Sequence, residues 1–243
     1  MNNEKKKHLS NLYDKKYIND RGLTPPEILL RKYPQNRFEA AVKWVSGGGR
    51  LLEIGAGRGG IVKALLPRFK ECIVTEISKP RVTALDDYFS DNTKVKVLHH
   101  DIDSEKLPFS DGYFDVVLLV DVIEHVIDPI SVLSEINRVL VNGGKLFIHT
   151  PNLAKWTRRL KLLFGFFPST ASMNEGLEQY GTKEPTNLYD EGHLHYFTFR
   201  SLSRLLKERS GFREVIKHGY GPLKLFCDLW PALLSDIVLI AVK

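Results

Sequence analysis

The sequence has only two cysteines, Cys72 and Cys227, and no apolar run approaching the roughly 18 residues that a membrane-spanning helix needs. Two cysteines are too few for a disulfide framework and lack the spacing of a metal site, so we expect core thiols in a reducing compartment. The first residues, MNNEKKKHLS, are polar and lead into no apolar segment, which argues against a secretory signal. These absences predict a cytoplasmic protein.

An excess of positive over negative charge is also scarce outside one short segment. The 243 residues carry a formal net charge of +6. Residues 153–168 hold no acid and a cluster of cations, Lys155, Arg158, Arg159 and Lys161. Because a nucleic-acid footprint spreads over a wider surface, we do not expect a nucleic-acid partner. No pattern predicts an oligomeric state.

Short apolar runs alternate with helical patterns along most of the chain. A helix is expected from Pro25-Pro26 to about Trp44, after a weakly patterned arm that is either loose or a short helix over the site. Strands are expected at 50–54, 72–77, 95–99, 114–120, 145–149, 212–217 and 237–242, and helices at 60–69, 80–89, 129–140 and 199–209. The apolar strand runs favour an α/β fold with a mostly parallel, doubly wound sheet that has helices on both faces.

A glycine-rich loop follows the first of these strands, in the sequence RLLEIGAGRGG over residues 50–60. Gly55, Gly57 and Gly60 match the G-x-G-x-x-G pattern of dinucleotide-binding loops. That pattern alone is weak, because glycine turns after strands are common. Bare backbone N–H groups at a helix N-terminus let a ligand approach closely.

Three carboxylates narrow the choice of ligand for this loop. Glu53 precedes the glycine loop and would repel a pyrophosphate, whereas it suits an ammonium group. Glu76 ends the second strand, where an acid can accept from both ribose hydroxyls. Asp101 ends the third strand and can accept from an adenine amine. The predicted ligand is an adenosine that carries an amino-acid tail and no phosphates, which disfavours an NAD-dependent oxidoreductase.

Residues 38–243 resemble the class I S-adenosylmethionine-dependent methyltransferases. The stretches that carry the resemblance are LLEIGAGRGG, VTEIS, HHDIDSEKLPF, DGYFDVVLLVDVIEHV and INRVLVNGGKLFIHTPN. The resemblance implies a Rossmann-like, seven-stranded sheet with an antiparallel late strand. It further implies an N-terminal arm over residues 1–24, a methyltransferase domain over 25–243 and a lid insertion at about 153–196.

The resemblance also implies which residues bind S-adenosylmethionine. The implied cofactor-binding residues are Glu53, Gly55, Ala56, Gly57, Gly59, Glu76, Ile77, Asp101, Ile102 and Asp121. Within this set the glycine loop surrounds the methionine moiety and Asp121 sits beside its methyl end.

Two polar clusters are candidates for the acceptor side, and three interpretations of them stay open. Asp121, Glu124 and His125 share one face if a helical turn follows the fourth strand. In EGHLHYF, His193 and His195 lie on one side of an extended chain. In the first interpretation, His125 is a general base, or the acceptor is bound by His193, His195 and Tyr196.

Second, Glu124, His125 and either His193 or His195 hold a divalent metal. That set is similar to the E-x-x-E-H motif of small-RNA terminal ribose 2′-O-methyltransferases, although Asp121 replaces its first Glu. Third, Glu124 and His125 only hydrogen-bond to loops.

The basic segment is also amphipathic. On a helical wheel, apolar side chains gather opposite the cations; they are Leu153, Trp156, Leu160, Leu163, Phe164 and Phe167. The segment resembles the lid of family members that act on lipid-linked quinone precursors. It is interpreted as a substrate lid, as a peripheral membrane contact through residues 153–168 or as an RNA contact, and the first two are compatible.

The sequence as a whole predicts a methyltransferase that acts on a hydroxyl of a small or lipid-linked acceptor such as a sugar, phenol or quinone precursor. N-methylation is a further option. The alternatives are a metal-dependent RNA ribose 2′-O-methyltransferase and a non-catalytic module that binds S-adenosylmethionine.

Overall fold

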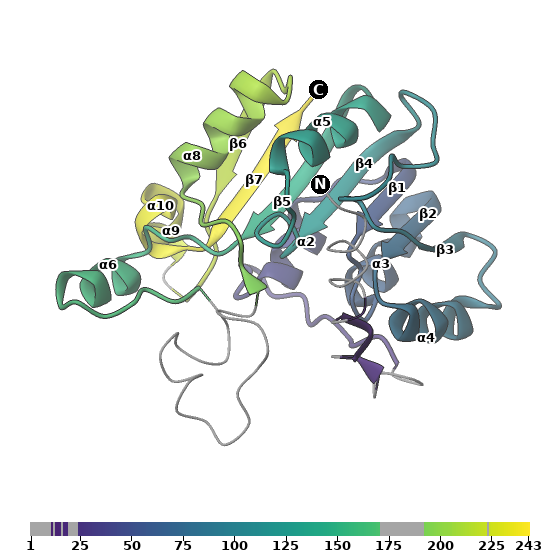
Figure 1. Ribbon diagram of the computed structural model, residues 1–243, viewed down its shortest axis with the longest axis horizontal. Helices are drawn as coiled ribbons and strands as arrows, with labels where there is room; N and C mark the ends of the chain where they lie inside the picture. The colour runs from purple at the N-terminus through teal and green to yellow at the C-terminus, as the bar shows by residue number, and fades with distance from the viewer. Residues whose placement is uncertain (1–10, 12, 16, 19–23, 171–191, 223) are drawn as a thin grey trace.

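A seven-stranded sheet forms the centre of the protein, in the order β3-β2-β1-β4-β5-β7-β6 (Figure 1). The computed structural model describes residues 11, 13–15, 17–18, 24–170, 192–222 and 224–243. The strands are β1 (Gly48–Ile54), β2 (Phe69–Glu76), β3 (Val95–His99), β4 (Phe114–Val120), β5 (Leu140–Thr150), β6 (Glu214–His218) and β7 (Ile237–Val242). Strands β1 to β5 pair in parallel, and β7 is antiparallel to both β5 and β6. The predicted fold class is therefore confirmed.

Helices cover both faces of this sheet (Figure 1). Among the described residues the helices are α2 (Arg37–Trp44), α3 (Gly60–Leu65), α4 (Lys79–Phe89), α5 (Pro129–Val139), α6 (Trp156–Leu163), α8 (Phe199–Arg204), α9 (Lys224–Leu229) and α10 (Pro231–Leu234), with single turns at Leu66–Arg68 and Leu205–Arg209. In β1, Leu52 belongs to the core cluster that includes residues of α5 and α8, while Leu51 belongs to the cluster that includes residues of α2 and α3. Burial on both faces explains why the strands read as continuous apolar runs.

The carboxyl ends of the parallel strands meet at one edge of the sheet. The end of β1, Ile54, lies opposite Thr75 of β2 and Leu119 of β4. The loops that follow these strands therefore converge. In open α/β sheets this edge is where ligands bind.

The expected helix from Pro25 to Trp44 is wrong in its first part, because α2 begins only at Arg37 and residues 24–36 are irregular. Asn36 caps α2 by accepting hydrogen bonds from two backbone N–H groups of the first turn. Pro34 lacks an N–H and disfavours the helical conformation of the residue before it. The irregular segment lies beside α3, where Lys63 donates to the carbonyl of Pro25 at 3.4 Å.

Other differences are smaller. Strand β5 begins at Leu140 instead of Lys145, so the expected stop at Asn142-Gly143-Gly144 lies within it. The helices α9 and α10 are not foreseen. Within the expected insertion the structure describes α6, and residues 171–191 lie outside the described residues. No helix among the described residues is long and apolar enough to cross a bilayer.

Candidate active site

A cavity of about 790 Å³ opens at the carboxyl edge of the sheet. The sequence-predicted residues that line it are Glu53, Gly55, Ala56, Gly57, Glu76, Ile77, Asp101, Ile102, Asp121, Glu124, His125 and His193. Three other predicted residues, Gly59, His195 and Tyr196, are not part of its lining. One cavity thus joins the expected cofactor loop to part of the expected acceptor side.

The glycine loop adopts backbone conformations in which a residue with a side chain would be strained. Gly55 has φ +70°, and a Cβ there would lie 2.5 Å from Cγ2 of Val122. Gly59 has φ +72° and caps α3, and a Cβ there would lie 2.7 Å from Cδ2 of Leu85. Gly55 thus brings bare backbone to the cavity, whereas Gly59 serves the turn and its packing.

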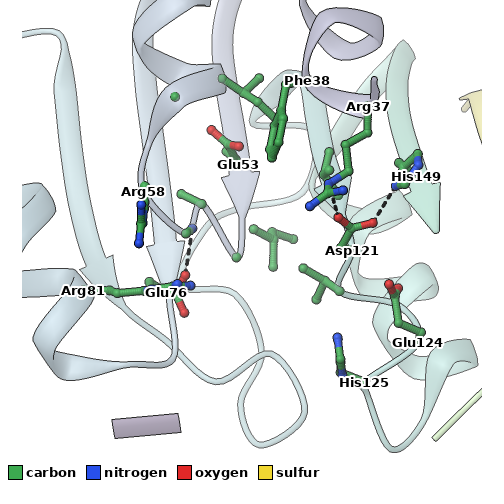
Figure 2. Close-up of a pocket in the computed structure, with 18 of the residues that line it drawn as sticks. Arg37, Phe38, Glu53, Arg58, Glu76, Arg81, Asp121, Glu124, His125 and His149 are labelled. Atoms are coloured by element: carbon green, nitrogen blue, oxygen red, sulfur yellow. Dashed lines mark hydrogen bonds and ion pairs between the residues drawn. The ribbon is translucent and has the colours of Figure 1, made fainter. Parts of the chain in front are cut away.

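Glu53 is a buried carboxyl at the wall of the cavity (Figure 2). Its Oε2 accepts a hydrogen bond from the backbone N–H of Val62 at 3.1 Å. Burial raises the pKa of Glu53 to about 8. Because a bound cation favours the ionised form of such a group, the site fits the ammonium group of S-adenosylmethionine.

Glu76 ties the loops after β1 and β2 together. Its Oε2 accepts from the N–H of Gly57 at 2.9 Å, and its Oε1 accepts from the N–H of Ile77 at 3.0 Å (Figure 2). Burial raises its pKa as well. The N–H of Ser78 also donates to Oε1, at 3.4 Å. A carboxylate offers about four acceptor positions, so a hydroxyl of a ribose can still be accepted here.

Asp101 is engaged by its own turn. Its Oδ1 accepts from the N–H of Asp103 at 3.0 Å, and its Oδ2 accepts from the hydroxyl of Ser104. The neighbouring Ile102 adds an apolar wall to the cavity. Ile102 therefore offers an apolar contact for the face of an adenine ring, and Asp101 offers a carboxylate that can accept from its amine.

Asp121 lies at the centre of a charged network (Figure 2). It has a left-handed backbone, with φ +54°, and forms ion pairs with Arg37 and with Nδ1 of His149, the latter at 2.6 Å. Nε2 of His149 lies 3.0 Å from the hydroxyl of Tyr220. Burial disfavours the Asp121 carboxylate, but His149 and the Arg37 guanidinium outweigh that effect and lower its pKa.

Sequence reasoning does not find the three partners of this network. His149 stands at the carboxyl end of β5 in IHTPN, so its place at the edge of the sheet was a usable signal. Arg37 and Tyr220 come from segments far away along the chain and carry no comparable signal.

Glu124, His125 and His193 form a second polar cluster. Potential ligand atoms of the three side chains all lie within 4.8 Å of one another. Oε2 of Glu124 accepts from the hydroxyl of Thr150 at 2.9 Å, and its buried Oε1 has no hydrogen-bond partner among the described residues. Burial, and then the charge of Asp121, raise the pKa of Glu124 to about 8.

The two histidine rings of this cluster are in edge-to-face contact, with centroids 4.7 Å apart. Nδ1 of His125 lies 3.2 Å from the carbonyl oxygen of Gly192, and Nδ1 of His193 lies 2.6 Å from the hydroxyl of Thr170. Each ring is thereby held in one orientation toward the cavity that it lines.

The expectation that His193 and His195 lie on one side is wrong. The N–H groups of Leu194 and His195 both donate to the carbonyl of Glu124, at 2.8 and 3.1 Å. Successive N–H groups of an extended chain point in opposite directions, so the chain turns here. The ring of His195 packs near Phe197 instead.

Two further predicted positions lie away from the cavity or cannot be placed. Tyr196 contacts the ring of Phe167. Glu191, which belongs to the predicted motif, lies outside the described residues.

Part of the N-terminal arm lies over the cavity. Tyr13 and Tyr17 line it, and the N–H of Tyr17 donates to the carbonyl of Tyr13 at 3.1 Å, as in a helical turn. The Tyr13 ring lies 6.4 Å from that of His125, and the guanidinium of Arg81 lies 3.3 Å from the centroid of the Tyr17 ring. Of the two expectations for this arm, the described residues show the short helical turn.

Solved structures of methyltransferases share this fold. The YcgJ protein of Bacillus subtilis has a TM-score of 0.55 at 16% identity over 85% of this chain and 97% of that chain. A putative methyltransferase of Bacillus halodurans C-125 has a TM-score of 0.58 at 15% identity over 85% and 98%. The fold is that of the class I, Rossmann-like S-adenosylmethionine-dependent methyltransferases. Residues 29–217 match the model of the methyltransferase-domain family Methyltransf_23, and the chain belongs to this family.

Curated relatives match over a shorter region. A ubiquinone biosynthesis O-methyltransferase of Cereibacter sphaeroides is 30% identical over 105 residues, which are 43% of this chain and 42% of the relative. A ubiquinone/menaquinone biosynthesis C-methyltransferase of Chromobacterium violaceum is 31% identical over 114 residues, 46% of each chain. The matched region therefore spans less than half the length of these relatives.

Proposed function

We propose that this protein transfers the methyl group of S-adenosylmethionine to a hydroxyl oxygen of a small or lipid-linked acceptor, such as a sugar, a phenol or a quinone precursor. One observation carries the proposal. The cavity that holds Glu53 and Glu76 beside the glycine loop also holds the paired rings of His125 and His193. The relative named a ubiquinone biosynthesis O-methyltransferase favours a quinone precursor among these acceptors.

In this proposal His125 acts as the general base. Its Nδ1 donates to the carbonyl of Gly192, so Nε2 of the neutral ring carries the lone pair. When bound, S-adenosylmethionine supplies an electrophilic methyl carbon on a sulfonium. His125 takes the proton of the acceptor hydroxyl. At the same time the hydroxyl oxygen forms the new C–O bond to the methyl carbon, and the electrons of the broken C–S bond stay on sulfur. His193 orients the acceptor beside it.

The test is methyl transfer by His125→Ala and by a matched control, His195→Ala. A panel of a catechol, a short-chain prenylated catechol, a hexose and an RNA with a free terminal ribose serves as acceptor, and mass spectrometry detects the product. Removing a general base costs about 100-fold or more in kcat, so His125→Ala should lose at least that much while His195→Ala stays near the wild type.

Equal turnover by His125→Ala and the wild type would refute the role of His125. Tight cofactor binding with no turnover of any acceptor would favour the alternative of a non-catalytic binding module.

The three-residue cluster supports a second candidate, a metal-dependent RNA ribose 2′-O-methyltransferase. Glu124, His125 and His193 offer one oxygen and two nitrogen donors, a set that suits a divalent cation such as Mn²⁺. A cation held there would lower the pKa of a nearby hydroxyl. Asp121 is engaged by Arg37 and His149 and stands apart from this set.

The metal candidate predicts that Mn²⁺ raises the melting temperature of the wild type, because a ligand that binds the folded state alone stabilises it. Glu124→Gln, which keeps the side-chain volume, should lose that rise. EDTA should then abolish methylation of the RNA acceptor. A melting temperature indifferent to Mn²⁺ would eliminate this candidate and leave the first one intact.

A further inference from the structure

Helix α6 lies on the domain with its charged side inward. Lys155 and Arg158 form ion pairs with Asp236 at 3.2 and 2.6 Å, and their side chains are only 28% and 14% exposed. In contrast, Leu163 and Phe164 are 75% and 72% exposed. A helix on the surface of a globular domain normally buries its apolar stripe, so the arrangement here is inverted.

The inverted helix and the residues just after it carry six exposed apolar side chains, here called the α6 ridge. The α6 ridge consists of Trp156, Leu160, Leu162, Leu163, Phe164 and Phe166, all of them exposed. None of the eight residues of α6 is buried. In Figure 1 the helix extends away from the sheet, beside α9 and α10.

A second apolar patch adjoins the base of this ridge. The α9–α10 patch consists of the exposed residues Phe226, Leu229, Trp230 and Leu233. The side-chain amide of Asn152, just before α6, donates to the carbonyls of Ala232 at 2.8 Å and of Ser235 at 3.0 Å. These bonds hold the start of α6 against the end of α10, so the two apolar surfaces are fixed beside each other.

The charges beside the ridge indicate what covers it. Lys155 and Arg158 are turned inward onto Asp236, whereas Arg159, on the same helix as the ridge, remains exposed. Exposed Trp156 and Trp230 add rings that prefer the boundary between apolar and polar surroundings. Basic residues beside an aromatic, apolar face are typical of helices that lie in the interface of an anionic bilayer.

We propose that the α6 ridge and the α9–α10 patch form a surface that binds an anionic lipid bilayer. The surface adjoins the cavity, because Arg158 and Asp236, which join α6 to the domain, also line the cavity. A bilayer at this face would bring lipid-linked acceptors to the mouth of the site. The membrane surface does not depend on the chemistry of the acceptor, and its test requires no turnover.

The test is flotation of the full chain with vesicles of phosphatidylcholine alone or of phosphatidylcholine with phosphatidylglycerol. The wild type should float with the anionic vesicles and be released by high salt. The double variant Leu163→Ser/Phe164→Ser should reduce the partition coefficient about tenfold or more, because it removes two large apolar side chains from the contact. Ile130→Ser on α5, where Ile130 is 43% exposed, is the matched control and should behave as the wild type.

Circular dichroism establishes that the variants are folded. Absence of flotation with anionic vesicles, or equal flotation of the double variant, would overturn the proposal. A dimer in light scattering that the double variant abolishes, without vesicle binding, would assign the surface to a second copy of the chain and also overturn it.

Discussion

At the scale of single residues, the cofactor side of the cavity is built around carboxyl groups that the fold keeps away from water. Glu53 is only 2% exposed and accepts one backbone hydrogen bond. Ionising such a buried carboxyl costs free energy unless a cation binds beside it. The same property that suits it to an ammonium group thus makes the ligand-free protein sensitive to pH.

Glu53→Gln should remove the part of that sensitivity that Glu53 contributes, while Glu76 and Glu124 keep theirs. The pKa of Glu53 is about 8 in the folded protein against an ordinary value of 4.5, so between these pH values the folded state retains a proton that the unfolded state has released. The free energy of unfolding of the wild type therefore falls as pH rises through this window, by about 1 kcal/mol per pH unit for this group. The free energy of unfolding, measured in urea without cofactor at several pH values, should rise for the variant relative to the wild type as pH rises. Parallel pH profiles would contradict the prediction.

Spacing in the sequence finds most residues of the cofactor side because parallel strands end at one edge. Glu53, Glu76 and Asp101 follow three such strands, and all line the cavity. The network around Asp121 is different. Arg37 reaches it from the first turn of α2 and Tyr220 from the chain after β6, and the placement of both depends on tertiary packing. No local pattern encodes such contacts.

At the scale of elements, the loop between β1 and α3 positions the cofactor side, and its shape depends on Gly55. This glycine combines a left-handed backbone with contact to Val122 of the next loop along the edge. The loop is thus fixed from two sides, by its own dihedral angles and by its neighbour.

Gly55→Ala should destabilise the protein more than Gly143→Ala. Both glycines have positive φ, +70° and +77°, so both substitutions carry a backbone cost of about 1 kcal/mol. At Gly143 a Cβ meets nothing within 4 Å, whereas at Gly55 it meets Val122 at 2.5 Å. Overpacking should add about 1–3 kcal/mol at Gly55, together with weaker cofactor binding. Urea unfolding of the two variants checks this order, and equal losses would speak against the clash.

The accuracy of the predicted elements follows their burial. Strands β4 and β7 have the bounds expected from the sequence, because their apolar runs match the buried stretch of chain. Strand β3 also has the expected bounds, although none of its residues is buried. The segment from Pro25 to Pro34 is not the predicted helix, because a proline favoured in a first helical turn also fits an extended chain that packs on α3. The short helices α9 and α10 lack the length that a periodic pattern needs.

At the scale of the whole molecule, cofactor binding should stabilise the entire domain, since the cavity joins loops from both halves of the sheet. S-adenosylmethionine and its demethylated product should each raise the melting temperature with concentration, and NAD should not. Glu76→Gln should reduce the rise, because the carboxylate that ties two loops together is then lost. A rise with NAD alone would overturn the assignment of the cofactor site.

Strand β7 lies between β5 and β6 although it follows both along the chain. During synthesis on the ribosome, β6 is therefore made before the strand that joins it to the sheet. Until residues 237–242 emerge, β5 keeps an open edge, and open strand edges are templates for aggregation. A pause in translation just before β7 would thus prolong the time for which the edge of β5 is open, because the latest of these seven strands to be made is the one that joins β6 to the sheet.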